Sequence, residues 1–295
     1  MTEVLEIGVS VLMFAFVAES MITSGLGLTI PQIIEPFKNK KMVMLSLIAN
    51  FVLVPLFAYG LLWVLPVSDG VRIGIILLSI SGGAPFIPKI VETAKGRVGG
   101  AVGLMLLLLV VTIFLMPVVV PAIFPGASIH AWDITRSLIY SMLIPLVLAL
   151  FVKARFSDIA IRIQPFFAKL TNITALLLFL AIVYLDIDVI VSNVSALPVI
   201  LIFFLGAFGI GYLTGGKNRN ARIILSVGTG LRNPTVAILV AGQYFSSEPM
   251  AAITPLLVII IGLLILIPLA TKIGQKTEGG PLDQSFVAFK YSEGV

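Results

Sequence analysis

The sequence predicts an all-α membrane protein with about nine transmembrane helices, on the strength of three observations. Hydrophobic residues make up 59% of the 295 positions, charged residues make up only 11%, and the mean hydropathy is +1.15. Soluble domains are about 45–50% apolar and about 25% charged, so this chain has too few charges to cover a water-facing surface. In addition, apolar runs of membrane-spanning length recur along the chain, and basic residues gather in alternate linkers.

The apolar runs give the predicted spans, because crossing a bilayer takes roughly 20 mainly apolar residues. They fall at about 5–30, 42–65, 72–94, 97–124, 134–153, 170–191, 197–214, 222–245 and 250–271. We therefore divide the chain into a transmembrane domain, residues 1–273, and a polar, glycine-rich cytoplasmic tail, residues 274–295.

The distribution of lysine and arginine predicts the orientation of these spans. Fifteen of the 19 basic residues fall after spans one, three, five and seven or in the tail, whereas only Arg72 and Arg136 fall in the other linkers. Cytoplasmic loops carry an excess of such residues. We expect a multi-pass protein of the inner (plasma) membrane, with its N-terminus outside and its C-terminus in the cytoplasm. The two remaining basic residues, Lys89 and Arg232, lie inside predicted spans.

Spans three and eight are interrupted near their middles. The first contains Gly82-Gly83, Pro85 and Pro88, and the second contains Gly228, Gly230 and Asn233-Pro234. Glycine loosens a helix, and proline removes a backbone donor, so each span is expected to split into two half-helices. In span eight, Asn233 suits the N-cap of the second half-helix, and Pro234 suits its first position.

Two broken spans of opposite direction, five helices apart, predict inverted repeats that meet at a site near the bilayer midplane. Half-helix N-termini attract anions, and Lys89 and Arg232 add two formal charges. Glycine and proline also make ordinary packing kinks in membrane helices, but two matched breaks with one intramembrane cation each favour a site. The expected substrate is a small organic anion such as a carboxylate, and the candidate binding residues are Lys89, Arg232, Asn233, Thr229, Thr235, Gly83 and Pro85.

At these residues the chain resembles the bile acid:sodium symporter family, in its bacterial and organellar branch and its nine-helix form. Three blocks carry the resemblance: GLGLTIPQIIEPFKNKKMVMLSLIANFVLVPLFAYGLL (25–62), SGGAPFIPKIVETAKGR (81–97) and VGTGLRNPTVAILVA (227–241). The resemblance implies a panel domain and a core domain, with substrate bound beside two crossing broken helices. It also implies secondary transport by alternating access.

The sequence departs from the family where sodium ligands are expected. The Ser-Asn pair of the first crossover is replaced by residues 85–89, and the shared glutamate falls at Gly228 or Thr229. The Gln-Asn pair reads Arg232-Asn233, and the hydroxyl ligands of the next helix fall near Met105 and Leu109. Asn50 stands where the family has a glutamine ligand.

We therefore expect Lys89 and Arg232 to occupy, as fixed cations, the space where relatives bind sodium. Coupling would then be to protons or absent, and the candidate ion-coupling residues are Glu19, Lys89 and Asn50. Glu19, in the middle of span one, is a candidate counter-charge or proton carrier. A structural ion pair between Glu19 and Lys89 is an equally open interpretation, as is a sodium-coupled symporter of a bile-acid-like or other organic acid.

Other classes of function fit the sequence less well. There is no cysteine and a single histidine, so the sequence offers no nucleophile–base pair or metal-ligand cluster for an enzyme, and no metal or cofactor is expected. A polar-lined continuous pore would favour a channel, whereas this sequence has a single matched pair of helix breaks. The expected partners are the organic anion and the lipid bilayer rather than nucleic acid, and the sequence does not indicate an oligomeric state.

Overall fold

The predicted fold class is confirmed in the computed structural model, which describes residues 2–29, 31, 39–125 and 130–278. Within these ranges every regular element is helical. In chain order they are α1 (Thr2–Gly27), α3 (Lys40–Ile48), η2 (Ala49–Leu53), α4 (Val54–Val64), α5 (Asp69–Ser79), α6 (Ile87–Thr93), α7 (Val98–Ile123), α8 (Ala131–Leu138), η3 (Ile139–Leu143), α9 (Ile144–Arg155), α10 (Ser157–Ser192), η4 (Val194–Ala196), α11 (Leu197–Thr214), α12 (Arg219–Gly230), α13 (Pro234–Tyr244) and α14 (Pro249–Glu278).

The lengths and compositions of these helices suit a membrane. Seven helical stretches among the described residues are long and apolar enough to cross a bilayer, and a shorter apolar helix covers Val11–Gly27. The remaining predicted span, 72–94, is divided between α5 and α6. Large apolar side chains stand exposed on the outside of the bundle, including Trp63 at 89% and Leu213 at 78%. Exposed apolar surface of this extent marks contact with lipid.

Two helices extend further than the apolar runs indicate. The segment 154–169 was expected to be largely a linker, but α10 begins at Ser157, directly after Phe156. Apart from Pro165, this segment of mixed polar and apolar residues contains neither proline nor glycine, the two strongest helix breakers, so it joins the following apolar run in one element with a kink at Asp186. Similarly, α14 continues five residues into the predicted tail, and residues 279–295 lie outside the described part.

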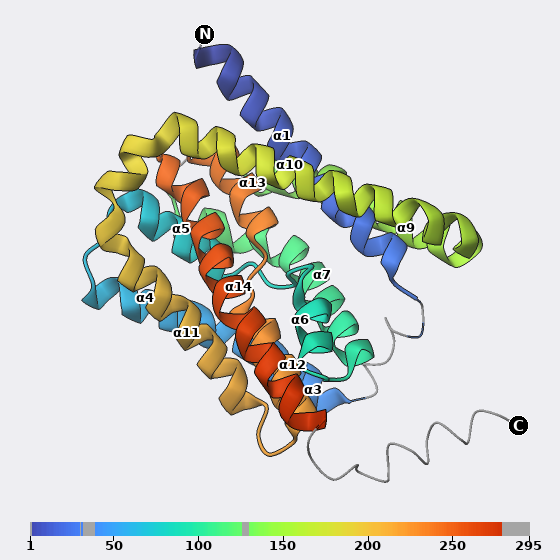
Figure 1. The fold of residues 1–295 in the computed structure, drawn as a ribbon. Coiled ribbons are helices and arrows are strands. Elements are labelled where there is room, and N and C mark those ends of the chain that lie inside the picture. The colour runs from blue at the N-terminus through green and yellow to red at the C-terminus, as the bar shows by residue number, and fades with distance from the viewer. Residues whose placement is uncertain (1, 30, 32–38, 126–129, 279–295) are drawn as a thin grey trace, which may run out of the picture.

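The helices form two groups. One group consists of α1, α9 and α10, which pack against one another and lie along one side of the remaining helices (Figure 1). In the other group α5 packs on α13 and α14, while α6 packs on α7 and α12. The α12–α13 span lies at the centre of this second group, and every residue of its apolar window is buried.

Both predicted helix breaks are confirmed. In span three, α5 ends at Ser79 and α6 begins at Ile87; in span eight, α12 ends at Gly230 and α13 begins at Pro234. The first half of each broken span packs against the second half of the other. This pairing requires the two spans to run in opposite directions, as the inverted repeats predicted from the sequence would have them.

Candidate functional site

The two helix breaks are joined at Asn233. Its backbone N–H donates to the Ser81 carbonyl at 2.8 Å, and its side-chain Nδ2 donates to the Gly83 carbonyl at 3.2 Å. Its Oδ1 accepts from the backbone N–H of Thr235 at 3.1 Å. The last bond is the N-cap predicted for this residue, with Pro234 at the first position of α13. One buried asparagine therefore both starts α13 and ties it to the first break.

The neighbouring residue, Arg232, carries a formal charge into the centre of the protein. Its side chain is only 1% exposed. Nε donates to the Leu78 carbonyl at 3.1 Å, and Nη2 donates to the carbonyls of Ser79 and Asn50 at 2.6 and 3.2 Å. Nη1 donates to Oδ1 of Asn50. All four of these acceptors are neutral oxygens, and among the described residues no carboxylate lies within 4.0 Å of the guanidinium.

The oxygens that accept hydrogen bonds from Arg232 lie where regular α-helical hydrogen bonding ends or changes. Leu78 and Ser79 are the last residues of α5, where carbonyls lack the α-helical partner four residues on and the helix dipole is negative. The Leu78 carbonyl also accepts from the backbone N–H of Ser81 at 3.0 Å. Asn50 lies in η2, a π-helical turn, and such turns often mark functional sites. A buried carbonyl without a partner costs free energy, so the guanidinium satisfies groups that the breaks leave open. Arg232 thereby connects the α12–α13 break, the end of α5 and the π-turn.

Asn50 extends the same network to Thr229. Its Nδ2 donates to Oγ1 of Thr229 at 3.2 Å and to the Ser46 carbonyl at 2.9 Å. Asn50 and Thr229 are both fully buried. The structure thus brings Asn50, Thr229, Arg232, Asn233 and Gly83 together in one polar network, which we call the crossover network. The backbone N–H of Thr235, itself buried, also belongs to it through Asn233.

The first break depends on a close approach to α7. The N–H of Gly82 donates to Oγ1 of Thr112 at 2.9 Å, and the hydroxyl of Thr112 lies 3.3 Å from the Gly82 carbonyl. Gly83 has a φ of +84°, and a Cβ there would lie 2.5 Å from the backbone N of Leu109. Sequence reasoning missed Thr112. The signal was available, because Thr112 is the one hydroxyl-bearing residue in the apolar run 98–123.

Lys89 does not lie beside Arg232 as expected. Its side chain is 77% exposed, and its Nζ forms an ion pair with Oε2 of Glu92 at 2.9 Å. The short helix α6 buries Ile87, Ile90 and Val91, which leaves Lys89 on the opposite face. The suggested pairing of Lys89 with Glu19 is therefore not what the structure shows.

Two other candidates also lie apart from the crossover network. Glu19, in α1, is half-buried, and its Oε2 is buried with no hydrogen-bond partner among the described residues. Pro85 is half-buried in the first break. Among the described residues, no three histidine or acidic side chains are placed to hold a metal ion.

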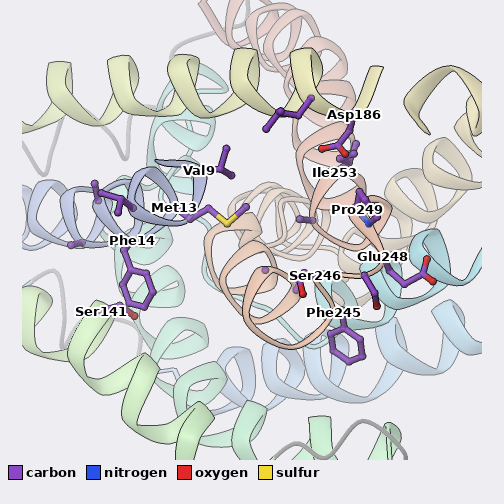
Figure 2. A pocket seen from close by; sticks show the side chains of 18 of the residues that line it. Val9, Met13, Phe14, Ser141, Asp186, Phe245, Ser246, Glu248, Pro249 and Ile253 are labelled. Carbon is purple, nitrogen blue, oxygen red and sulfur yellow. The ribbon is translucent and has the colours of Figure 1, made fainter. Parts of the chain in front are cut away.

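A cavity of about 1290 Å³ lies between parts of the two groups of helices, and we call it the panel cavity. It is walled by Met13 and Phe14 of α1, Asp186 of α10, and residues 241–253 at the α13–α14 junction (Figure 2). Most of its lining is apolar, with hydroxyls from Ser141, Ser246 and Ser247 and the carboxyl groups of Asp186 and Glu248. It reaches the C-terminal half of α13 but not the crossover network, whose members are not in its wall.

Replacing Asn233 with alanine is expected to lower the free energy of unfolding by about 1–2 kcal/mol, since it removes an N-cap and a buried interhelical bond. Thermal unfolding of the purified protein measures this change. Asn218, which caps α12 through a bond to the N–H of Ala221 at the exposed end of that helix, provides the control. Asn218→Ala should have the smaller effect, and an equal effect would show that the bond to Gly83 contributes nothing.

Replacing Lys89 with alanine is expected to leave the unfolding temperature unchanged. Exposed ion pairs three residues apart on a helix contribute little to stability, and Lys89 has this kind of pair with Glu92. A clear loss of stability in Lys89→Ala would contradict the exposed placement of this side chain.

The match to known families covers the first part of this architecture. The model of the Sodium Bile acid symporter family matches residues 11–193, which include the first broken span and Asn50 but end before Arg232. A comparison with curated proteins gave no match. The matched region is more than half of the chain and contains the first of the two helix breaks predicted from the sequence. The chain therefore belongs to the sodium bile acid symporter family, a family of membrane transporters.

Proposed function

We propose that the protein is a secondary transporter that moves a small organic anion by alternating access, with the guanidinium of Arg232 in place of a coupling sodium ion. The observation that carries this proposal is the set of neutral oxygens around Arg232. Carbonyl and amide oxygens are the ligands that hard cations such as sodium take. Here a side chain of the protein already uses them as hydrogen-bond acceptors.

The charge of Arg232 supports an anionic substrate. A buried arginine stays charged, and no carboxylate of the described residues compensates it within 4.0 Å. The N-terminus of α13, which begins two residues later, adds positive potential in the same region. A negative charge brought near the crossover network would therefore be stabilised, whereas a cation would be repelled.

The panel cavity supports alternating access. Its walls come from both groups of helices, with Met13 of α1 lying next to Gly242 of α13, and it holds enough space for a small organic molecule. Movement of the α1–α9–α10 group against the rest would change the size of this cavity. The same movement would bring a bound solute closer to the crossover network, whose residues are buried in the described structure.

Proton coupling is proposed to involve Glu19. Ionisable groups inside a membrane are costly and commonly serve in ion or proton pathways. The Oε2 of Glu19 is buried without a hydrogen-bond partner in the described structure, so this carboxyl oxygen takes part in no described structural contact inside the predicted span. Glu19→Gln should then remove the response of uptake to a proton gradient while leaving counterflow exchange intact.

A ligand screen followed by a transport assay tests the proposal. Thermal unfolding of the purified protein in potassium buffer, with a panel of small organic acids, identifies a ligand that raises the unfolding temperature. Uptake of that acid into proteoliposomes should saturate, show counterflow, and proceed equally in sodium and potassium. Strict dependence of uptake on a sodium gradient would instead establish a sodium-coupled symporter, and flux without saturation or counterflow would indicate a channel.

A further inference from the structure

A second cavity, of about 710 Å³, lies at the opposite end of the bundle from the panel cavity, and we call it the basic cavity. Its wall, as far as the described residues form it, contains Lys41, Arg97 and Lys217 and no acidic residue. Cationic side chains around one cavity, with no carboxylate among these described lining residues, create a local field that attracts anions. This end carries the basic linkers that predict the cytoplasmic side.

The backbone adds to this field, because three helices begin at the basic cavity. α3 begins at Lys40, α7 at Val98 and α12 at Arg219, and lining residues come from the first turn of each. The side chains of Asn39 and Asn218 cap α3 and α12, whereas α7 has no side-chain cap. Helix N-termini present partial positive charge. Their convergence therefore reinforces the three side-chain charges.

The loop that closes the cavity has a fixed shape. Gly216 has a φ of +62°, and its carbonyl accepts from both Nε and Nη2 of Arg222. The guanidinium of Arg222 also lies over the ring of Tyr212 and donates to its hydroxyl at 2.9 Å. These contacts hold the turn that carries Lys217, so its ammonium group is presented from an ordered backbone.

The inner part of the cavity is apolar, with Leu45, Ile224 and Leu225 in its wall. Large apolar side chains that face the lipid lie close by in sequence, including Met44 at 64% and Leu213 at 78% exposed. The cavity lies at the ends of the helices, where lipid headgroups are expected. Its basic rim suits a phosphoryl headgroup, and its apolar interior suits the acyl chains of the same lipid.

We propose that the basic cavity binds a phosphoryl group, as presented by the headgroup of an anionic phospholipid or by free phosphate. The ligand would bridge α3, α7 and α12, and α12 is the half-helix that leads directly into Arg232. Occupancy would therefore stabilise one end of the second broken span. This inference is independent of the substrate and of the coupling ion.

Titration of the purified protein with defined ligands tests the proposal, with the unfolding temperature as readout. The ligands are phosphatidylglycerol, phosphatidylcholine and inorganic phosphate, at constant ionic strength. Phosphatidylglycerol should raise the unfolding temperature, whereas phosphatidylcholine should not. In the double variant Lys41→Gln, Lys217→Gln, the concentration of phosphatidylglycerol at half-saturation should rise at least about tenfold. Each basic residue near a membrane surface contributes several-fold to the affinity for an anionic lipid.

The double variant Arg162→Gln, Lys169→Gln on α10 serves as the control, because it removes the same charge outside the basic cavity. It should retain the wild-type titration. A response to inorganic phosphate alone that is lost in the cavity variant would identify free phosphate as the ligand, and a response to phosphatidylglycerol alone would identify lipid. Equal titrations of the cavity and control variants, or no response to either anion, would overturn the proposal.

Discussion

Replacing Arg232 with methionine is expected to abolish solute uptake and to lower the free energy of unfolding by about 2–4 kcal/mol. Methionine fills part of the space but donates no hydrogen bond. The carbonyls of Ser79 and Asn50 would then be buried without this partner, at a cost of about 1–3 kcal/mol each, whereas the Leu78 carbonyl would keep its bond from the N–H of Ser81. Release of the buried charge offsets part of this loss. Thermal unfolding in potassium buffer and uptake into proteoliposomes measure the two effects.

Arg162→Met provides the matched control for this experiment. It makes the same chemical change at an exposed position of α10, away from the crossover network. We expect it to leave both uptake and stability close to wild type. If Arg232→Met also kept wild-type uptake, the guanidinium would have no part in transport, and the role assigned to it would be wrong.

Replacing Gly83 with alanine is expected to be among the most damaging changes available in the first break. The added Cβ would lie 2.5 Å from the backbone N of Leu109 and 2.6 Å from the Met105 carbonyl, so the backbone of α7 would have to move. The positive φ of this residue adds further strain for an L-residue. We expect a loss of about 3 kcal/mol or more, the size of other severe core clashes. Folded yield and thermal unfolding provide the measurement.

Gly216→Ala separates the two causes of this effect. Gly216 also has a positive φ, of +62°, but a Cβ there would meet no atom within 4 Å. Its replacement should therefore cost only the backbone strain, about 1 kcal/mol. Equal losses in the two variants would mean that the approach of Gly83 to α7 does not matter.

The helix breaks were predictable because their signals are local. Gly82-Gly83 and Asn233-Pro234 disfavour a continuous helix whatever surrounds them, and the N-cap at Asn233 follows from the residue type and its position before proline. The apolar runs similarly placed the membrane helices to within several residues. Their ends were less predictable, as at Ser157, because helix continuation through polar residues has no strong local signal.

The partners of the two intramembrane cations could not be predicted in the same way. Arg232 contacts the end of α5 and the π-turn at Asn50, and both contacts depend on how distant segments cross. Lys89 was placed near the midplane because it lies within an apolar run. The short helix α6, however, restarts at Ile87 with a rotation that exposes Lys89 and lets it pair with Glu92. Sequence spacing does not specify that rotation.

Binding of sodium to this protein can be measured directly, without knowledge of the substrate. The unfolding temperature of the wild type and of Arg232→Gln is recorded as sodium replaces potassium at constant ionic strength. We expect no saturable effect of sodium on the wild type. We expect sodium to stabilise Arg232→Gln, in which the oxygens of Leu78, Ser79 and Asn50 become available to the ion. Saturable stabilisation of the wild type by sodium would contradict the claim that Arg232 occupies the ion's place.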